Sequence, residues 1–291
     1  MTQENHKTLM STAQHLLHAT IRIEGKHANG KAAAGTGFHI RLQIDGEFVP
    51  AIITNKHVLD GLEDCFLHLT VADEAGAPTA ERMPFYIEAF KNTWISHPDP
   101  NIDLALLPIQ PLLARVQLLN KRVFYVDLTT ELIPTDATFA SLSPIEEITM
   151  VGYPSGLWDA ANNRPVVLRG ITATACNSDY RGEAEFLIDA AVYPGSSGSP
   201  VFIFNQGAYT TSDGVAVGSR LLFIGVLSAV HLQTVSGEIK TIKVPTALGQ
   251  VTLTQISNHL GVCVRASKIR GFIPVIREKI AALKEAAKAA S

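Results

Sequence analysis

Residues 195–200 form a turn that could carry a catalytic serine. The run reads Gly195-Ser196-Ser197-Gly198-Ser199-Pro200, and its glycines permit a sharp backbone turn. A hydroxyl on such a turn can attack a carbonyl carbon while neighbouring main-chain N–H groups stabilise the oxyanion. The spacing predicts Ser197 as the nucleophile. Ser196 and Ser199 are the alternative nucleophiles, and an ordinary flexible turn is the alternative without chemistry.

A histidine and an aspartate flank two apolar runs, which are predicted strands. If these strands hold the two side chains near the serine, they could activate its hydroxyl. His57 follows the apolar run 52–54, and Asp103 precedes the apolar run 104–109. A carboxylate at the head of an apolar strand is costly to bury unless it is hydrogen-bonded. A histidine Nδ1–H would supply that bond and leave Nε2 to take the proton of the serine. The order His57, Asp103, Ser197 therefore predicts a catalytic triad, although most of the ten histidines must have other roles.

Short β-type segments dominate residues 17–264 and would have to position these side chains. Val, Ile, Thr and Phe recur in runs bounded by Gly, Asn, Asp and Pro, for example at 19–23, 37–42, 148–151 and 222–226. Such a series without helical periodicity predicts a sandwich or a barrel. Helices are expected only at the ends, over 4–17 and over 268–290, because the latter is rich in strong helix formers.

Composition limits the classes of function. The chain has 291 residues, 46% hydrophobic and 18% charged, with a net charge of −3, so nucleic acid and anionic membranes are not expected partners. No secretory signal is visible at the start, and no apolar run is long enough for a membrane span. Cys65, Cys176 and Cys263 lack metal-site spacing and are expected to be buried free thiols. We therefore expect a soluble, cytoplasmic protein.

Three motifs together resemble the trypsin/chymotrypsin-like serine peptidases over residues 35–270. Residues 54–57 (Thr-Asn-Lys-His), 103–107 (Asp-Leu-Ala-Leu-Leu) and 195–200 are similar to the family's histidine, aspartate and serine boxes. Residues 35–38 (Gly-Thr-Gly-Phe), 152–157 and 189–194 resemble the bacterial branch that includes the high-temperature-requirement (heat-shock) peptidases. We do not expect the C-terminal peptide-binding domain that this branch often carries, because few residues follow Arg270 in this sequence.

The resemblance implies an all-β fold of two six-stranded antiparallel β-barrels, chymotrypsin-like, with short terminal helices. The expected division is 1–17 for an N-terminal helical segment, 18–125 for the first barrel, 126–268 for the second and 269–291 for a C-terminal helix. Gly195 and Ser197 would supply the N–H groups of the oxyanion hole. Acyl-enzyme chemistry of this kind needs no cofactor and no metal. The expected partner is a protein or peptide substrate, with a regulatory protein as a further partner and the oligomeric state left open.

The expected substrate-binding residues are apolar or small. By the resemblance they are Ala191, Val192, Ser228, Ala229 and Val230, and Ser228 would also lie behind Asp103. A charged side chain in such a pocket would lack a counter-ion, which predicts cleavage after small or medium aliphatic residues. His231 stands nearby and is expected either at the rim of the pocket or merely exposed; the alternative is a role in selecting glutamate, because bacterial glutamyl peptidases have a histidine in this region. Two alternatives to a constitutive endopeptidase remain: a regulated cytosolic effector peptidase that is silent until a partner orders its cleft, and a catalytically inactive barrel that serves as a binding module.

Overall fold

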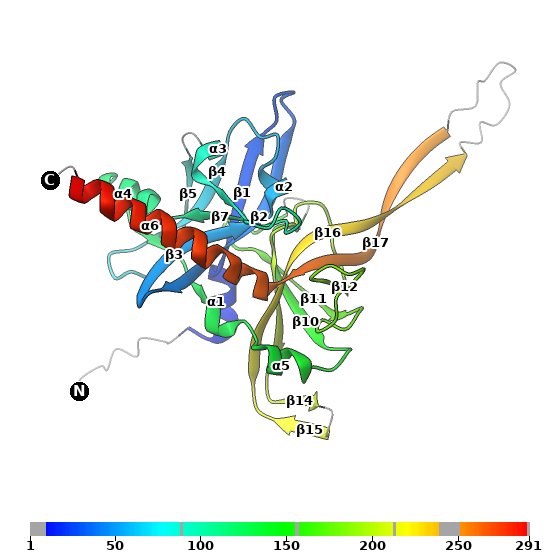
Figure 1. The fold of residues 1–291 in the computed structure, drawn as a ribbon. Coiled ribbons are helices and arrows are strands. Elements are labelled where there is room, and N and C mark those ends of the chain that lie inside the picture. Colours follow the sequence, from blue (N-terminus) through cyan, green and yellow to red (C-terminus); the bar gives the residue numbers. More distant parts are fainter. Residues whose placement is uncertain (1–9, 88–89, 155–156, 212–213, 239–250, 290–291) are drawn as a thin grey trace, which may run out of the picture.

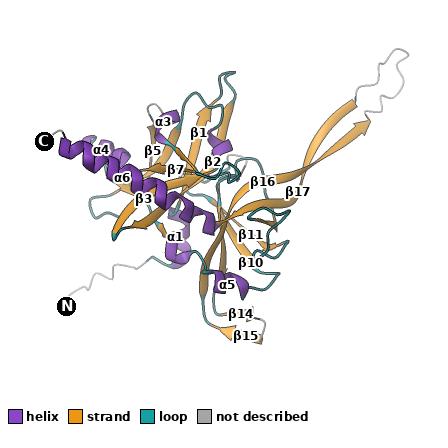
Figure 2. Ribbon diagram, viewed as in Figure 1, coloured by secondary structure: helices purple, strands orange, loops and turns teal. Residues whose placement is uncertain are grey.

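The computed structural model describes residues 10–87, 90–154, 157–211, 214–238 and 251–289, without the side chains of residues 91, 230–238 and 251–258. The chain forms two β-rich lobes, one from each half of the sequence (Figure 1). Strands make up most of both lobes, and the helices lie on the outside (Figure 2). The expected all-β, two-lobed architecture is thereby confirmed.

The first lobe is a single nine-stranded sheet. Its main path runs β5-β4-β1-β2-β3-β7-β6, β8 pairs with β4, and β9 pairs with β2 in parallel. Its strands are β1 (Thr20–Lys26), β2 (Ala32–Ile44), β3 (Glu47–Thr54), β4 (Phe66–Ala72), β5 (Pro78–Tyr86), β6 (Ile95–Ser96), β7 (Ala105–Pro108), β8 (Val123–Phe124) and β9 (Leu128–Thr129).

This sheet differs in detail from a six-stranded barrel. Among the described residues, no backbone pairing joins its end strands β5 and β6, so hydrogen bonds do not close it. The additional short strands β8 and β9 come from the segment that connects the lobes. The last strand of the first sheet therefore ends at Thr129, a few residues beyond the expected domain boundary.

The second lobe is a closed six-stranded barrel in the order β10-β11-β12-β17-β16-β13. Its strands are β10 (Glu147–Gly152), β11 (Val166–Thr172), β12 (Glu185–Ala190), β13 (Pro200–Asn205), β16 (Arg220–Glu238) and β17 (Val251–Arg265). A small separate hairpin consists of β14 (Ala208–Thr211) and β15 (Gly214–Val217). Strands β16 and β17 continue past the barrel as a long two-stranded ribbon that projects from the molecule (Figure 1).

Helices cover the ends and the connections. They are α1 (Thr12–His18), α2 (Lys56–Leu59), α3 (Phe90–Thr93), α4 (Gln110–Leu118), α5 (Asp136–Ala140) and α6 (Phe272–Ala289), with 3-10 turns at Thr130–Leu132 and Ala266–Gly271. A capping box on Ser11 fixes the start of α1. Both terminal helices were expected, and the part of the N-terminal one over residues 4–9 lies outside the described residues. The expectation that helices occur only at the ends is wrong, because α2, α3, α4 and α5 form in the connections between strands.

Three apolar clusters hold this frame together. The largest joins the lobes, because Phe38 of β2 contacts Phe223 of β16 edge-on and Phe272 of α6 packs into the same cluster. The three cysteines are buried and free, as expected, and burial raises the pKa of the Cys65 thiol to about 12. No helix of the described chain is long and apolar enough to cross a membrane.

Candidate active site

His57 stands at the place where an apolar strand ends. The last residues of β3 are fully buried, and Asn55 follows as the N-cap residue of the single-turn helix α2. The buried Asn55 donates from Nδ2 to the main-chain oxygen of Asp103 at 2.7 Å. His57 Nδ1 lies 2.6 Å from Asp103 Oδ2, and its backbone N–H donates to Oδ1 at 3.2 Å. The aspartate therefore fixes both the ring and the main chain of the histidine.

Asp103 is the most heavily bonded group of the site. Besides the two contacts with His57, its Oδ2 accepts a hydrogen bond from Ser228 Oγ at 2.8 Å. Burial raises the pKa of this carboxyl, but the hydrogen bonds and charge of His57 and the bond from Ser228 lower the pKa by more. The net pKa lies below the usual value for aspartate, so the carboxylate is ionised at neutral pH and holds the Nδ1 proton of His57.

The serine turn has the backbone geometry that its glycines permit. Gly195 and Gly198 adopt φ angles of +89° and +87°, a region open to glycine at no steric cost. The Gly198 N–H donates to the Leu227 oxygen at 2.8 Å and so anchors the turn on β16. Ser197 is partly exposed. Ser196 and Ser199 are fully buried, and among the described residues their hydroxyls have no hydrogen-bond partner.

A threonine of the first lobe also holds this turn of the second. The Thr36 N–H donates to the Ser197 oxygen at 2.9 Å, and Thr36 Oγ1 donates to the Gly195 oxygen at 3.1 Å. Thr54 Oγ1 donates to the Thr36 oxygen at 2.7 Å. A Cβ at Gly198 would lie 1.9 Å from that same oxygen, so only glycine fits there. We call this set of contacts between Thr36, Thr54 and residues 195–198 the interlobe clasp.

Sequence reasoning assigned no role to Thr36, Thr54 or Asn55. All three lie inside the motifs 35–38 and 54–57, which carry the family resemblance. Their signal was therefore present, but the contacts cross more than a hundred residues of chain in the case of Thr36 and the serine turn.

Ser228 connects the aspartate to the serine. Its main-chain oxygen accepts a long hydrogen bond of 3.4 Å from Ser197 Oγ, while its own hydroxyl bonds Asp103. Within the described residues, no hydrogen bond joins His57 to Ser197. Catalytic hydrogen bonds are often long in the absence of substrate and shorten when it binds. No described residue accepts a hydrogen bond from the N–H groups of Gly195 and Ser197, so both donors are available to an incoming oxyanion.

The expected substrate-binding residues occupy different environments. Ala191 is half-buried and Ala229 is exposed. Val192 is buried in the interior cluster of the second barrel, where it packs over Gly261. The side chains of Val230 and His231 lie outside the described residues, although both residues belong to β16. The described part of the chain contains no group of three or more His, Cys, Asp or Glu side chains that could hold a metal ion.

An ionised aspartate, an oriented imidazole and a serine beside free N–H groups can together transfer an acyl group to water through a serine ester. That chemistry on a two-lobed β frame belongs to the serine hydrolases. The family model described as "Trypsin-like peptidase domain" matches residues 35–209, which is more than half of the chain. The chain therefore belongs to the trypsin-like peptidase family and is a serine endopeptidase.

Solved structures of proteases are among those similar to this chain. The HtrA-type protease AlgW with a tripeptide is 15% identical, with a TM-score of 0.45, over 92% of this chain and 62% of that chain. The active form of the Rv3671c protease from M. tuberculosis is 18% identical, with a TM-score of 0.43, over 88% and 79%. The serine endoprotease from Yersinia pestis is 14% identical, with a TM-score of 0.42, over 93% and 68%. No curated protein sequence matches the chain.

Proposed function

We propose that this endopeptidase uses Ser197 as nucleophile, His57 as general base and acid, and Asp103 to orient the histidine, and that it cleaves after small or medium aliphatic residues. The observation that carries this proposal is the 2.6 Å contact between His57 Nδ1 and a carboxylate that two further hydrogen bonds keep ionised. A surface histidine without a catalytic role would not need such an arrangement.

The proposed reaction proceeds in two halves. Ser197 Oγ attacks the scissile carbonyl carbon, and its proton passes to His57 Nε2. The oxyanion is stabilised by the N–H groups of Gly195 and Ser197, each such donor typically contributing about 3 kcal/mol. His57 then protonates the leaving amine, the C–N bond breaks, and water attacks the resulting ester by the reverse sequence. Asp103 remains ionised throughout and stabilises the imidazolium.

The preference for an aliphatic residue before the cut follows from the residues expected around its side chain. None of Ala191, Ala229 and Val230 can pair with a charge, and Val192, which was expected beside them, is buried inside the second barrel. A buried charge without a partner costs several kcal/mol even after the protein relaxes. One methylene more or less changes the free energy by only about 1–3 kcal/mol, so selection among aliphatic side chains is modest.

A second candidate is the same peptidase in a dormant state that a protein partner activates. The feature that favours it is the position of Ser197 Oγ, which bonds the Ser228 oxygen rather than His57. A catalytically inactive binding barrel is disfavoured, because His57, Asp103 and Ser197 are all present. His57 contacts Asp103, and Ser228 is hydrogen-bonded to both Asp103 and Ser197.

A fluorophosphonate probe, which labels only an activated serine, tests the proposal. We expect rapid labelling of the wild-type protein, no labelling of Ser197→Ala, and unchanged labelling of Ser196→Ala. Labelling of the wild type only after a partner or peptide is added would establish the dormant state. Labelling that persists in Ser197→Ala would refute the assignment of the nucleophile.

A further inference from the structure

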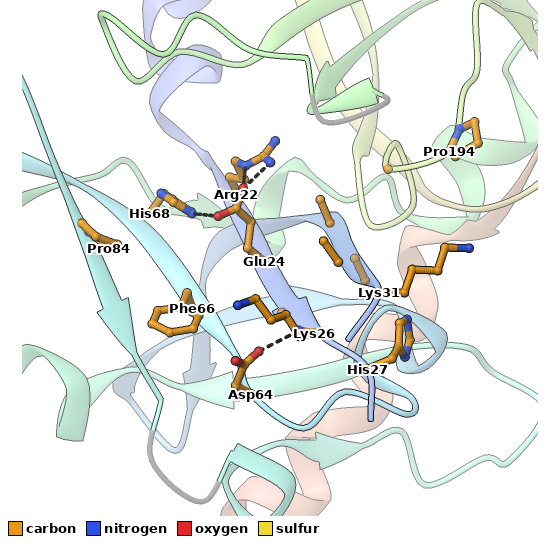
Figure 3. A pocket seen from close by; sticks show the side chains of 15 residues that line it. Arg22, Glu24, Lys26, His27, Lys31, Asp64, Phe66, His68, Pro84 and Pro194 are labelled. Carbon is orange, nitrogen blue, oxygen red and sulfur yellow. Dashed lines mark hydrogen bonds and ion pairs between the residues drawn. The ribbon is translucent and has the colours of Figure 1, made fainter. Parts of the chain in front are cut away.

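A cavity of about 790 Å³ lies beside the serine turn, on the side of the first lobe (Figure 3). One wall consists of Pro194 and Gly195, at the start of the serine turn, and the others come from β1, β2, the turn between them, β4, the loop before β4, and β5. The cavity therefore adjoins the place where the scissile carbonyl oxygen would be held.

The cavity lies on the leaving-group side of that place. Substrate residues before the cut are expected along residues 228–230 of β16, in the second lobe. The described residues that line the cavity include none from β16. A substrate that passes Ser197 in an extended conformation would continue from the second lobe toward β2, so the residues after the cut would enter this cavity.

The spacing of residues along β2 indicates which substrate residues would lie in the cavity. Thr36 of β2 is bonded to Ser197, and the lining residues Ala34 and Ala32 lie two and four positions earlier in the same strand. At about 3.3 Å per residue these positions lie about 7 and 13 Å from Thr36. An extended peptide has the same rise, so its second to fourth residues after the cut would lie along this stretch.

Two lysines face this stretch without a partner of opposite charge. Lys26 ends β1 opposite Ala32, and Lys31 precedes Ala32 in the connecting turn. Figure 3 shows Lys26 on the side of Glu24 and Phe66, and Lys31 on the side of Pro194. Within the described residues neither ammonium group makes an ion pair or a hydrogen bond.

The acidic residues of the cavity are already engaged. Glu24 is bonded to Arg22, and its Oε2 lies 2.6 Å from Nε2 of the buried His68. Burial raises the pKa of Glu24, and these bonds lower it by more, which keeps the carboxylate ionised. Asp64 accepts the backbone N–H of Lys26 at 2.6 Å. With Arg22, Lys26 and Lys31 against Glu24 and Asp64, the lining is net positive in a chain whose net charge is −3.

We propose that this cavity is a specificity site for the part of the substrate that follows the scissile bond, and that Lys26 and Lys31 select acidic side chains at the second to fourth residues after the cut. This inference rests on the proposed function. The partner it describes is a peptide or protein segment with an aliphatic residue before the cut and a short acidic stretch after it.

Internally quenched peptides with one common aliphatic acyl half test this proposal. Their second to fourth residues after the cut are all Glu, all Gln or all Lys. We expect kcat/KM for the Glu peptide to exceed that for the Gln peptide about fivefold at low ionic strength, because exposed ion pairs are individually weak. The ratio should fall toward one at roughly 1 M salt, where the Debye length is only about 3 Å.

Charge-neutral variants of similar length locate the effect. In the double variant Lys26→Gln/Lys31→Gln the Glu-to-Gln ratio should fall to about one, whereas Lys121→Gln, which removes an exposed lysine paired with Glu81, should leave the ratio unchanged. All variants should hydrolyse a p-nitroanilide with the same acyl half equally, because that substrate has no peptide after the cut. A double variant that keeps the wild-type ratio would overturn the proposal.

The failure of this inference can be distinguished from failure of the proposed function. If no peptide is hydrolysed, binding of fluorescently labelled Glu, Gln and Lys peptides to Ser197→Ala is measured by anisotropy. If Ser197→Ala binds the Glu peptide most tightly, and the same protein with the further substitutions Lys26→Gln and Lys31→Gln does not, the specificity site is supported although no peptide is cleaved. Equal binding of the three peptides refutes it, whatever the outcome for catalysis.

Discussion

Replacing Asp103 by asparagine tests the proposed role of the hydrogen bonds around His57. In the wild type both carboxylate oxygens accept: Oδ1 from the His57 backbone N–H, and Oδ2 from His57 Nδ1 and Ser228 Oγ. An asparagine has one accepting oxygen and one donating amide group. Its oxygen must face the backbone N–H, which can only donate, so its NH₂ group takes the place of Oδ2.

That orientation changes the tautomer of the histidine. The NH₂ group donates to His57 Nδ1, and Ser228 Oγ can rotate to accept the second N–H. The ring proton then moves to Nε2, which can no longer accept the proton of Ser197. We expect kcat at neutral pH to fall about 10⁴-fold. That factor corresponds to a barrier about 5.5 kcal/mol higher, at about 1.36 kcal/mol per factor of ten.

The assay is peptide hydrolysis at neutral pH, combined with fluorophosphonate labelling and a melting temperature for each variant. Asp99→Asn is the matched control, because Asp99 lies in the loop before Asp103 and its carboxylate bonds only the backbone N–H of Asn101 among the described residues. We expect Asp99→Asn to keep wild-type turnover. Near-normal turnover of Asp103→Asn, or its loss in Asp99→Asn alone, would refute this reasoning.

Four further predictions concern the nucleophile, the interlobe clasp, the substrate specificity and the loss of stability at low pH. Ser197→Ala should lower turnover by at least about 10⁴-fold without a change in melting temperature; activity lost in Ser196→Ala instead would identify the other serine. Gly198→Ala should abolish labelling and destabilise the fold, because its Cβ would meet the Thr36 oxygen, whereas Gly30→Ala, also at positive φ but in open space, should keep labelling. In a library varied before the cut, Val, Ala, Ile and Leu should exceed Lys, Arg, Asp and Glu in kcat/KM, and a glutamate optimum lost in His231→Ala would contradict the aliphatic pocket. Because the pKa of Asp103 is lower in the folded protein than the unfolded value of about 4, its ionisation stabilises the fold above that pH. Urea titrations should therefore show the wild type losing stability relative to Asp103→Asn as the pH falls through the folded pKa. A stability difference that does not depend on pH would contradict this prediction.

Strand ends and backbone turns could be predicted where a single short motif determines them. The apolar run that ends at 54 and the one that begins at 104 predict strands, and β3 ends at Thr54 while β7 begins at Ala105. That His57 and Asp103 belong to the same lobe was implied by the family resemblance and not by these patterns. Likewise, the glycines at 195 and 198 predict a turn with positive φ angles, and both residues have them.

Contacts that depend on register could not be predicted in this way. The network of Arg22, Glu24 and His68 joins β1 to β4, and no local pattern states which residues of two strands face each other. The same holds for the cavity that these residues line, and for Val192, whose apolar character fits a pocket wall as well as the barrel interior that it occupies.

The strand order of the second barrel bears on when the enzyme can first act during its synthesis. Strand β17 pairs with both β12 and β16 and so closes the barrel, yet it is the last barrel strand to leave the ribosome. Until then β16 lacks one neighbour, and Leu227 and Ser228, which hold the serine turn and Asp103, lie on an incomplete sheet. A nascent chain therefore has His57, Asp103 and Ser197 outside the ribosome before β17 completes the sheet that holds them in place.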